Sequence, residues 1–296
     1  MKRRTALAAL GLGVAAAQWG CSLGPRDSAE DLDTPAQKPT LRNYPVAWVL
    51  SSGGPRGFVH VGVLKALFEL GLKPDLVVGS SVGALVGCLA AAGVGMARIE
   101  ALALETSMAS LFRLNFSGDL WLNGAGLAAL VNETVADQRL QQFATPFAAV
   151  AMRQHPQELV AFNWGNAGLA VQAACAVEGR LAPVRIAQSD YLDADRLSPL
   201  PVRLARQMGA TRVLAIDASA HEDKAPPTAT GYGASDLRKR ESTQADAVHA
   251  DMVLHPEFGY YTGVSREYRE RTIAAGYQQT LLQAQALRQL HAILSA

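Results

Sequence analysis

The chain has 296 residues, and its 27 basic and 26 acidic side chains leave a formal net charge of +1. Hydrophobic types make up 49% of the residues, enough to build a full core in one large domain or two small ones. The sequence contains no concentrated basic stretch, so it gives no indication of a nucleic-acid partner. No metal-ligand spacing of Cys and His is present either, so we predict neither a metal nor a cofactor.

The first twenty residues have the pattern of an export signal. Basic residues precede an apolar run over 6–17, which is shorter than the ~20 residues needed to span a bilayer. Cys21 follows in a Gly-Cys-Ser sequence that resembles the acylation site of bacterial lipoproteins, although Gln18 departs from that motif. We predict that residues 1–20 are removed and that acyl chains on Cys21 anchor the protein to a membrane surface. The protein is then expected on the periplasmic side of a bacterial cell envelope. The alternative is a plain secretory signal with a periplasmic or secreted product.

After the signal, the chain divides into a linker and one domain. Residues 25–45 are rich in Pro, Asp, Thr and Lys and lack apolar periodicity. We therefore expect residues 21–45 to hold the anchor cysteine and a flexible tether. The folded domain is expected over residues 46–296.

Strand and helix patterns alternate along this domain. Short apolar runs predict buried strands at 46–50, 76–78, 148–151, 213–216 and 252–254. Helical patterns cover 59–70, an Ala-rich stretch ending near 93, and the segments 166–177, 199–209 and 267–295. Residues 219–247 are polar and are expected to form a surface loop. This order predicts an α/β fold of three layers, α/β/α, around a mostly parallel sheet.

A possible nucleophile turn joins the second predicted strand to its helix. Gly79-Ser80-Ser81-Val82-Gly83 matches G-x-S-x-G, in which small flanking residues allow a turn so tight that the central serine projects above the sheet edge. The free N–H groups at the start of the next helix suit a developing oxyanion. We predict Ser81 as the nucleophile. Ser80 is the neighbouring alternative and is more typical of a turn residue.

The loop after the first predicted strand is rich in glycine. Gly53-Gly54-Pro55-Arg56-Gly57 lets backbone amides approach a ligand closely. Because both loops leave neighbouring strands at one sheet edge, the loop is a candidate oxyanion hole. Pro55 has no N–H, so the donors must be Gly53, Gly54, Arg56 or Gly57. The Arg56 side chain either holds the loop or meets an anionic head group. A plain tight turn is the alternative, and the spacing fits no nucleotide-phosphate motif.

The two motifs together resemble the patatin-like phospholipase family. The G-x-S-x-G turn follows the G-G-x-R-G loop by about 25 residues, and the segment Ser198-Pro199-Leu200-Pro201-Val202 continues a resemblance that covers most of residues 46–280. The resemblance implies a patatin-like fold and a serine hydrolase of lipid acyl esters, of the phospholipase A, lysophospholipase or esterase type. It also implies phospholipid or other acyl-ester substrates and a Ser-Asp dyad without histidine.

The resemblance places the catalytic acid at Asp193. The family's D-G-[GA] motif reads Asp193-Ala194-Asp195 here, so the usual glycine is lost and a second carboxylate is added. A carboxylate must be desolvated and hydrogen-bonded to serve as a base toward a serine. Glu178 and Arg180 are further departures close by. These changes keep a second interpretation open, a catalytically impaired lipid-binding or scaffold protein at a membrane.

Five other groups are alternative candidates for the base. They are Asp190, Asp195, His221, His249 and His255. Neither alternative aspartate fits the family's spacing. His255 is the best of the histidines for a Ser-Asp-His order. His60, below the glycine loop, is expected to pack within its helix.

Two apolar features each allow two interpretations. Residues 102–122 carry many Leu, Phe and Met side chains and either pack in the core or cap an acyl channel and touch a membrane. Cys88 and Cys175 lie in apolar stretches, where an unpaired thiol packs as a small hydrophobe. A disulfide between them is the alternative, but nothing in the sequence requires it.

Overall fold

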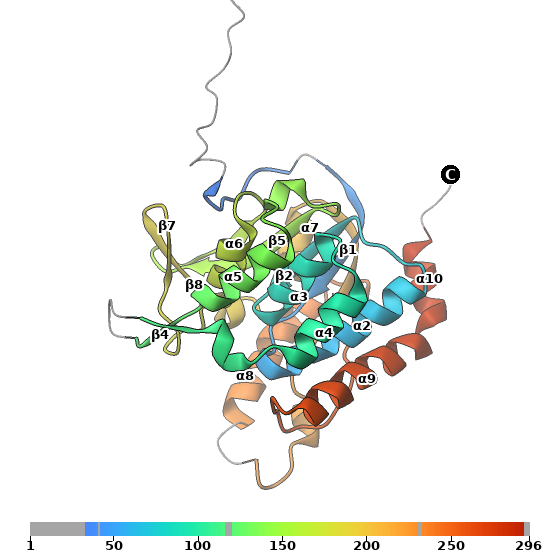
Figure 1. Ribbon diagram of the computed structural model, residues 1–296. Coiled ribbons are helices and arrows are strands. Elements are labelled where there is room, and N and C mark those ends of the chain that lie inside the picture. Colours follow the sequence, from blue (N-terminus) through green and yellow to red (C-terminus); the bar gives the residue numbers. More distant parts are fainter. Residues whose placement is uncertain (1–32, 41, 116–119, 230–232, 293–296) are drawn as a thin grey trace, which may run out of the picture.

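A central sheet with helices on both faces forms the body of the protein (Figure 1). The computed structural model describes residues 33–40, 42–115, 120–229 and 233–292. The strands are β1 (Tyr44–Leu50), β2 (Leu76–Ser80), β3 (Arg113–Leu114), β4 (Leu122–Asn123), β5 (Phe147–Arg153), β6 (Glu158–Phe162), β7 (Val184–Ile186), β8 (Ser189–Asp193), β9 (Ala210–Ile216) and β10 (Met252–Leu254). The helices are α2 (Phe58–Glu69), α3 (Val82–Ala91), α4 (Met96–Glu105), α5 (Ala125–Thr134), α6 (Ala167–Ala174), α7 (Val202–Gln207), α8 (Gly233–Ala247), α9 (Arg266–Leu282) and α10 (Ala284–His291).

The large sheet has a parallel half and an antiparallel half. Its order is β10-β9-β1-β2-β5-β8-β7, and β6 also pairs with β5. The strands from β10 to β5 run parallel, whereas β6 and β8 pair antiparallel with β5, and β7 pairs antiparallel with β8. All five predicted strands lie in the parallel half. The predicted three-layer α/β fold with a mostly parallel sheet is confirmed.

Alternating side chains of the central strand bury both faces of the sheet. Trp48 and Leu50 face the layer that contains α2 and α3, whereas Ala47 and Val49 face the side covered by α7. All four are fully buried. Burying a large apolar side chain contributes roughly 1.5–3 kcal/mol, so this two-sided packing fixes β1 as the centre of the domain. The loops after β1 and β2 therefore start from a rigid edge.

The sequence prediction was wrong for the segment 219–247. Much of it is the helix α8, which polar contacts rather than an apolar stripe attach to the domain. The buried Asp246 carboxylate accepts a hydrogen bond from Ser198 Oγ at 2.7 Å and forms an ion pair with Arg203. Arg240 pairs with Glu222 at 2.7 Å. A pattern search based on apolar periodicity has little to detect in such a helix.

The predicted tether contributes to the folded domain from residue 33 onward. Ala36 forms a β-bridge with Trp164, and the Lys38 amide donates to Asn163 Oδ1 at 2.7 Å. β1 begins two residues before the expected boundary, at Tyr44. The predicted export signal and the anchor Cys21 lie outside the described residues. Within the described ranges, no helix combines the length and the apolar character needed to cross a bilayer.

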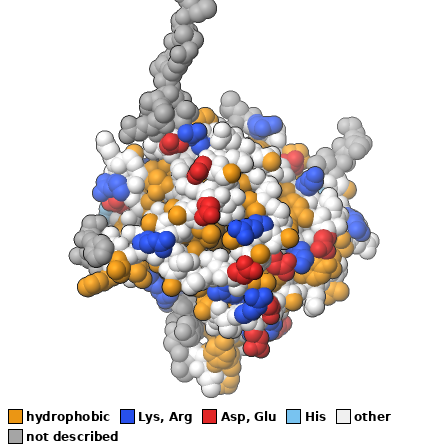
Figure 2. Space-filling model, in the orientation of Figure 1, with side chains coloured by type: hydrophobic (Ala, Val, Ile, Leu, Met, Phe, Trp, Pro, Cys, Tyr) orange, Lys and Arg blue, Asp and Glu red, His pale blue; other side chains and the backbone are white. Residues whose placement is uncertain are grey.

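Charges of both signs are interspersed on the face of the molecule drawn in Figure 2, and basic side chains gather nowhere on that face. A polyanion-binding surface would need such a gathering. The view therefore agrees with the near-zero net charge of the sequence.

Candidate active site

Ser81 lies at a strained backbone position between β2 and α3. Its φ of 52° and ψ of −125° are unusual for a residue with a side chain, and such strain tends to gather at functional sites. A Cβ on Gly79 would lie 2.4 Å from the carbonyl oxygen of Gly83, and a Cβ on Gly83 would lie 2.4 Å from that of Leu50. Both glycines of the motif are therefore required by close backbone contact.

The two neighbouring serines have different surroundings. Ser80 is completely buried, and its hydroxyl has no hydrogen-bond partner among the described residues. Ser81 lines a cavity and is 8% exposed. The turn therefore presents Ser81, as its position at the centre of the motif predicted.

Asp193 is the acid that meets this serine. It ends β8, is 4% exposed, and its carboxylate interacts with the Ser81 side chain. The backbone N–H of Asp195 also donates to Asp193 Oδ1, at 2.9 Å. Burial raises the pKa of Asp193 to about 7, and the negative charge of Asp195 adds to this rise. The Ser81 side chain, the Asp195 amide and the Lys239 ammonium lower the pKa of Asp193. A carboxylate with a pKa near 7 is well matched to general-base work at neutral pH.

The segment around Asp193 does not need the missing glycine. Ala194–Arg196 form a 3₁₀ turn, and Ala194 is fully buried against the apolar layer that contains α7. None of the residues of this turn has a positive φ. An alanine therefore occupies the glycine position of the D-G-[GA] motif without backbone strain.

The second carboxylate of the segment has partners of its own. Asp195 accepts a hydrogen bond from the Ser52 hydroxyl and forms an ion pair with Lys239 Nζ at 2.6 Å. Burial alone would raise the pKa of Asp195, but the Lys239 ammonium and the two hydrogen bonds hold it below its ordinary value. Asp195 is therefore a charged neighbour of the Ser81–Asp193 pair. The sequence assigned no role to Ser52 or Lys239, and no motif spacing points to Lys239.

The glycine-rich loop packs directly on the nucleophile turn. A Cβ on Gly57 would lie 2.2 Å from a Val82 methyl group, and one on Gly53 would lie 3.0 Å from Ala218 Cβ. Gly54 has a φ of 53°, which favours glycine. The Arg56 amide donates to the Gly53 carbonyl at 3.1 Å. The amides of Gly53 and Gly54 have no protein acceptor within the described part of the chain, so these two are the better candidate donors.

Arg56 holds the loop rather than facing a ligand. Its guanidinium donates to the Tyr260 carbonyl at 2.8 Å and lies 3.9 Å from the Asp236 carboxylate. Its side chain is mostly buried and stacks over the Tyr260 ring. Of the two roles that the sequence left open for this side chain, the structure favours the first.

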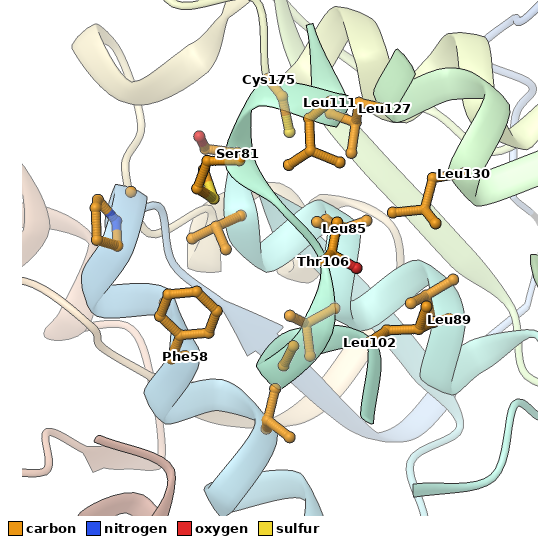
Figure 3. A pocket seen from close by; sticks show the side chains of 18 of the residues that line it. Phe58, Ser81, Leu85, Leu89, Leu102, Thr106, Leu111, Leu127, Leu130 and Cys175 are labelled. Carbon is orange, nitrogen blue, oxygen red and sulfur yellow. The ribbon is translucent and has the colours of Figure 1, made fainter. Parts of the chain in front are cut away.

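An apolar cavity of about 210 Å³ extends from Ser81. In Figure 3, Ser81 lies at the left of the cavity, and Leu89 and Leu130 lie at the right. Apart from Thr106 and Arg269, the other lining residues are apolar or glycine, and the lining comes from the glycine-rich loop, α2, α3, α4, α5, α9 and the segments 106–112 and 175–181. Cys175 is among them, and both Cys175 and Cys88 are free thiols, so the disulfide alternative was wrong.

The stretch 102–122 plays two parts. Leu102, Met108, Leu111 and Phe112 line the cavity and also pack in or against the apolar core. Leu114, Trp121 and Leu122 lie on the β3–β4 hairpin, and their side chains are 62%, 80% and 39% exposed. The hairpin projects from the body beside α5 in Figure 1. The Ala182 amide donates to the Leu122 carbonyl, which ties the hairpin to the chain next to the cavity residue Leu181.

Glu178 and Arg180 lie at this same side of the cavity. Both are exposed and follow Val177, which lines the cavity. Glu178 pairs with Arg196 at 3.3 Å. The two departures from the family pattern therefore alter the rim and leave Asp193 in its position.

Apart from Asp195, which adjoins Asp193, the alternative bases lie elsewhere. His255 Nε2 lies 3.1 Å from the Ser219 carbonyl oxygen, and its ring stacks on His221. The backbone carbonyl of His249 accepts from Arg206, and Asp190 pairs with Arg185 at the sheet edge. No histidine is among the described residues that line the cavity.

His60 packs within its helix, as predicted. It is fully buried, and its Nε2 lies 2.9 Å from the Ser51 carbonyl oxygen. Burial lowers the pKa of His60 to about 4. The imidazole is therefore neutral at physiological pH and supports the start of the glycine-rich loop.

Comparison with known proteins finds relatives by sequence. Patatin-like phospholipase domain-containing protein 6 of Mus musculus is 31% identical over 198 residues, which cover 62% of this chain and 14% of the mouse protein. Lysophospholipase nte1 of Emericella nidulans is 29% identical over 196 residues, covering 64% of this chain and 13% of the fungal protein. This chain therefore spans only a small part of the length of these relatives.

A solved structure shares the fold. VipD from Legionella pneumophila superposes with a TM-score of 0.56 at 14% identity, over 86% of this chain and 70% of VipD. The sequence profile described as patatin-like phospholipase matches residues 48–206. Because this match covers more than half of the chain and includes the glycine-rich loop, the serine turn and Asp193, the chain belongs to the patatin-like phospholipase family.

Proposed function

We propose that this protein hydrolyses acyl esters of lipids with Ser81 as nucleophile and Asp193 as base. The observation that carries the proposal is that Ser81, at one end of an apolar cavity, interacts with the desolvated Asp193 carboxylate. An acyl chain in that cavity brings its ester carbonyl to the serine. Each buried CH₂ group contributes ~0.8 kcal/mol to binding, which favours phospholipids, lysophospholipids or neutral lipid esters over short acyl groups.

The reaction proceeds in two steps. Asp193 accepts the proton of Ser81 as Oγ bonds to the carbonyl carbon, and the carbonyl electron pair moves onto oxygen, near the amides of Gly53 and Gly54. When this intermediate collapses, the bond to the alkoxy group breaks and that group takes the proton from Asp193. Water, deprotonated by Asp193, then attacks the acyl-serine ester, which releases the fatty acid and restores Ser81.

We further propose that the enzyme works at a membrane. The exposed Leu114 and Trp121 of the β3–β4 hairpin lie on the segment that continues from the cavity lining, so insertion of the hairpin would bring the cavity close to lipid chains. Acyl chains on Cys21 would keep the protein on the periplasmic side of the envelope, and a plain secretory signal remains the alternative. The substrate is then a lipid of the membrane that the protein contacts.

The scaffold alternative is less well supported. It was motivated by the loss of the glycine next to Asp193. Ala194 occupies that position without a positive φ, and Asp193 still interacts with Ser81. Hydrolysis is therefore the function that the geometry supports best.

A fluorophosphonate probe tests the proposal. We expect labelling of the wild-type protein, none of Ser81→Ala, and labelling of the matched control Ser80→Ala. Release of fatty acid from a panel of phospholipids, lysophospholipids and short-chain esters would then identify the substrate. Folded wild-type protein that neither reacts with the probe nor releases fatty acid would contradict the proposal and favour the scaffold.

A further inference from the structure

Asp195 lies between the two halves of the candidate site. Its backbone amide donates to Asp193 Oδ1 at 2.9 Å, so it contacts the acid directly. Its carboxylate accepts from the hydroxyl of Ser52, the residue immediately before the oxyanion donor Gly53. One residue thus touches both the acid and the start of the glycine-rich loop.

Lys239 reaches this residue from a different part of the fold. It lies on α8, and its ammonium group contacts Asp195 Oδ1 at 2.6 Å. The Lys239 side chain is 21% exposed and the Asp195 side chain is 47% exposed, so solvent partly screens this ion pair. The helix α8 is itself fixed by the buried Asp246, which is bonded to Ser198 and Arg203. Lys239 therefore lies on a helix, α8, whose position is fixed by other contacts.

We propose that Asp195 and Lys239 form a positioning pair that holds the acid and the oxyanion loop in register and balances the charge beside Asp193. This role rests on the proposed function of Ser81 and Asp193. Asp195 supplies the link through its amide and its carboxylate. Lys239 offsets the negative charge that this link places next to a buried carboxyl group.

The charges around Asp193 give the pair a measurable effect. Asp195 raises the pKa of Asp193, and Lys239 lowers it. The other titratable groups near Asp193 are the Cys175 thiol, whose pKa burial raises well above its ordinary value, and the Ser81 hydroxyl. Both are uncharged at neutral pH. Asp195 and Lys239 are thus the charged groups near Asp193 that act on its titration within the described residues.

Removing either partner therefore has opposite effects. In Lys239→Met the charge of Asp195 is no longer balanced, so the carboxylate form of Asp193 becomes less favourable and its pKa rises by roughly one pH unit. In Asp195→Asn the ammonium remains without its partner, and the pKa falls. The double variant returns close to the wild-type value, and so does Lys239→Arg, which keeps the positive charge.

Carbon-13 NMR of the Asp193 carboxyl group measures these values directly, with the resonance assigned by comparison with Asp193→Asn. Lys65→Met is the matched control, because Lys65 pairs with Glu100 away from the site. Opposite shifts in the two single variants, with return in the double variant, support the pair. Equal shifts, shifts of the same sign, or no shift in folded protein would overturn it. This titration needs no turnover, so it is independent of the test of Ser81 by fluorophosphonate.

A second measurement separates the effect of the Asp195–Ser52 hydrogen bond from the effect of the Asp195 charge. Asp195→Asn keeps an oxygen that can accept from Ser52, whereas Asp195→Ala removes it. We expect the hydrogen-bonded amides of Ser52, which donates to the Pro199 carbonyl, and Arg56, which donates to the Gly53 carbonyl, to exchange roughly tenfold faster in Asp195→Ala than in the wild type, and little faster in Asp195→Asn. Equal exchange in both variants would contradict the positioning role.

Discussion

The two halves of the central sheet contribute to the site in different ways. The parallel half supplies the nucleophile turn and the glycine-rich loop from the ends of β2 and β1, where backbone contacts fix the geometry. The antiparallel half supplies Asp193 at the end of β8, where side-chain hydrogen bonds and charges fix the geometry. A side-chain atom added at the glycines of the nucleophile turn would overlap the backbone. Around Asp193, in contrast, exchange of charged residues would change the pKa of the acid.

The largest expected effect comes from adding one methyl group to the parallel half. In Gly83→Ala the new Cβ would overlap the carbonyl oxygens of Leu50 and Ser51, so α3 must move away from β1. We expect a loss of roughly 3 kcal/mol in the free energy of unfolding, and no activity. Urea denaturation measures the loss. Gly95→Ala is the control, because a Cβ there meets nothing within 4 Å. Equal stability of the two variants would show that the turn is not constrained by packing.

The acid in the antiparallel half is expected to reduce stability. Because the pKa of Asp193 is raised to about 7 in the folded protein, the folded state binds a proton between about pH 4 and 7 that the unfolded state has lost. The contribution of Asp193 to stability therefore falls as pH rises through this window, by at most about 4 kcal/mol.

Asp193→Asn removes this cost while its amide oxygen still accepts from the Asp195 amide. We expect the variant to be the more stable protein at pH 8, with the difference in Tm shrinking as pH falls toward 4. Thermal unfolding at several pH values measures this. A difference that does not change with pH would mean that burial does not raise the pKa of Asp193.

The anchor of α8 is expected to have an intermediate effect. In Asp246→Asn the buried group loses its charge and its ion pair with Arg203, which costs about 1–3 kcal/mol. Amide exchange across α8 should accelerate more than exchange in α3. Glu241→Gln on the same helix is the control, because Glu241 is exposed. Slow exchange across α8 in Asp246→Asn would indicate that other contacts hold the helix.

The smallest effect is expected at the hairpin. Trp121→Ser should lower hydrolysis of lipid in vesicles severalfold, because it removes apolar area available to the membrane, and should leave hydrolysis of a soluble short-chain ester unchanged. Leu282→Ser is the control, since Leu282 is 82% exposed on α9, outside the hairpin. An equal loss on both substrates, or no loss on vesicles, would contradict membrane contact through the hairpin.

The sequence predicts the parallel half of the sheet better than the surroundings of Asp193. Apolar runs identified the parallel strands, and the spacing of Gly79, Ser81 and Gly83 identified the nucleophile turn, because backbone packing leaves a local signature. The position of Asp193 came from family resemblance alone. The partners Ser52 and Lys239 could not be predicted, since their contacts with Asp195 cross 143 and 44 residues of chain and follow no periodicity. The sequence pattern predicts a loop in place of helix α8 for the same reason.

The dependence of hydrolysis on Asp193 tests the central claim most directly. With a soluble acyl ester, kcat/KM of the wild-type enzyme should rise with pH and level off above about pH 7, because the base must be deprotonated. Asp193→Asn should lose nearly all activity at every pH while remaining folded. Full activity in Asp193→Asn, or a wild-type profile with no change near pH 7, would contradict the Ser81–Asp193 dyad.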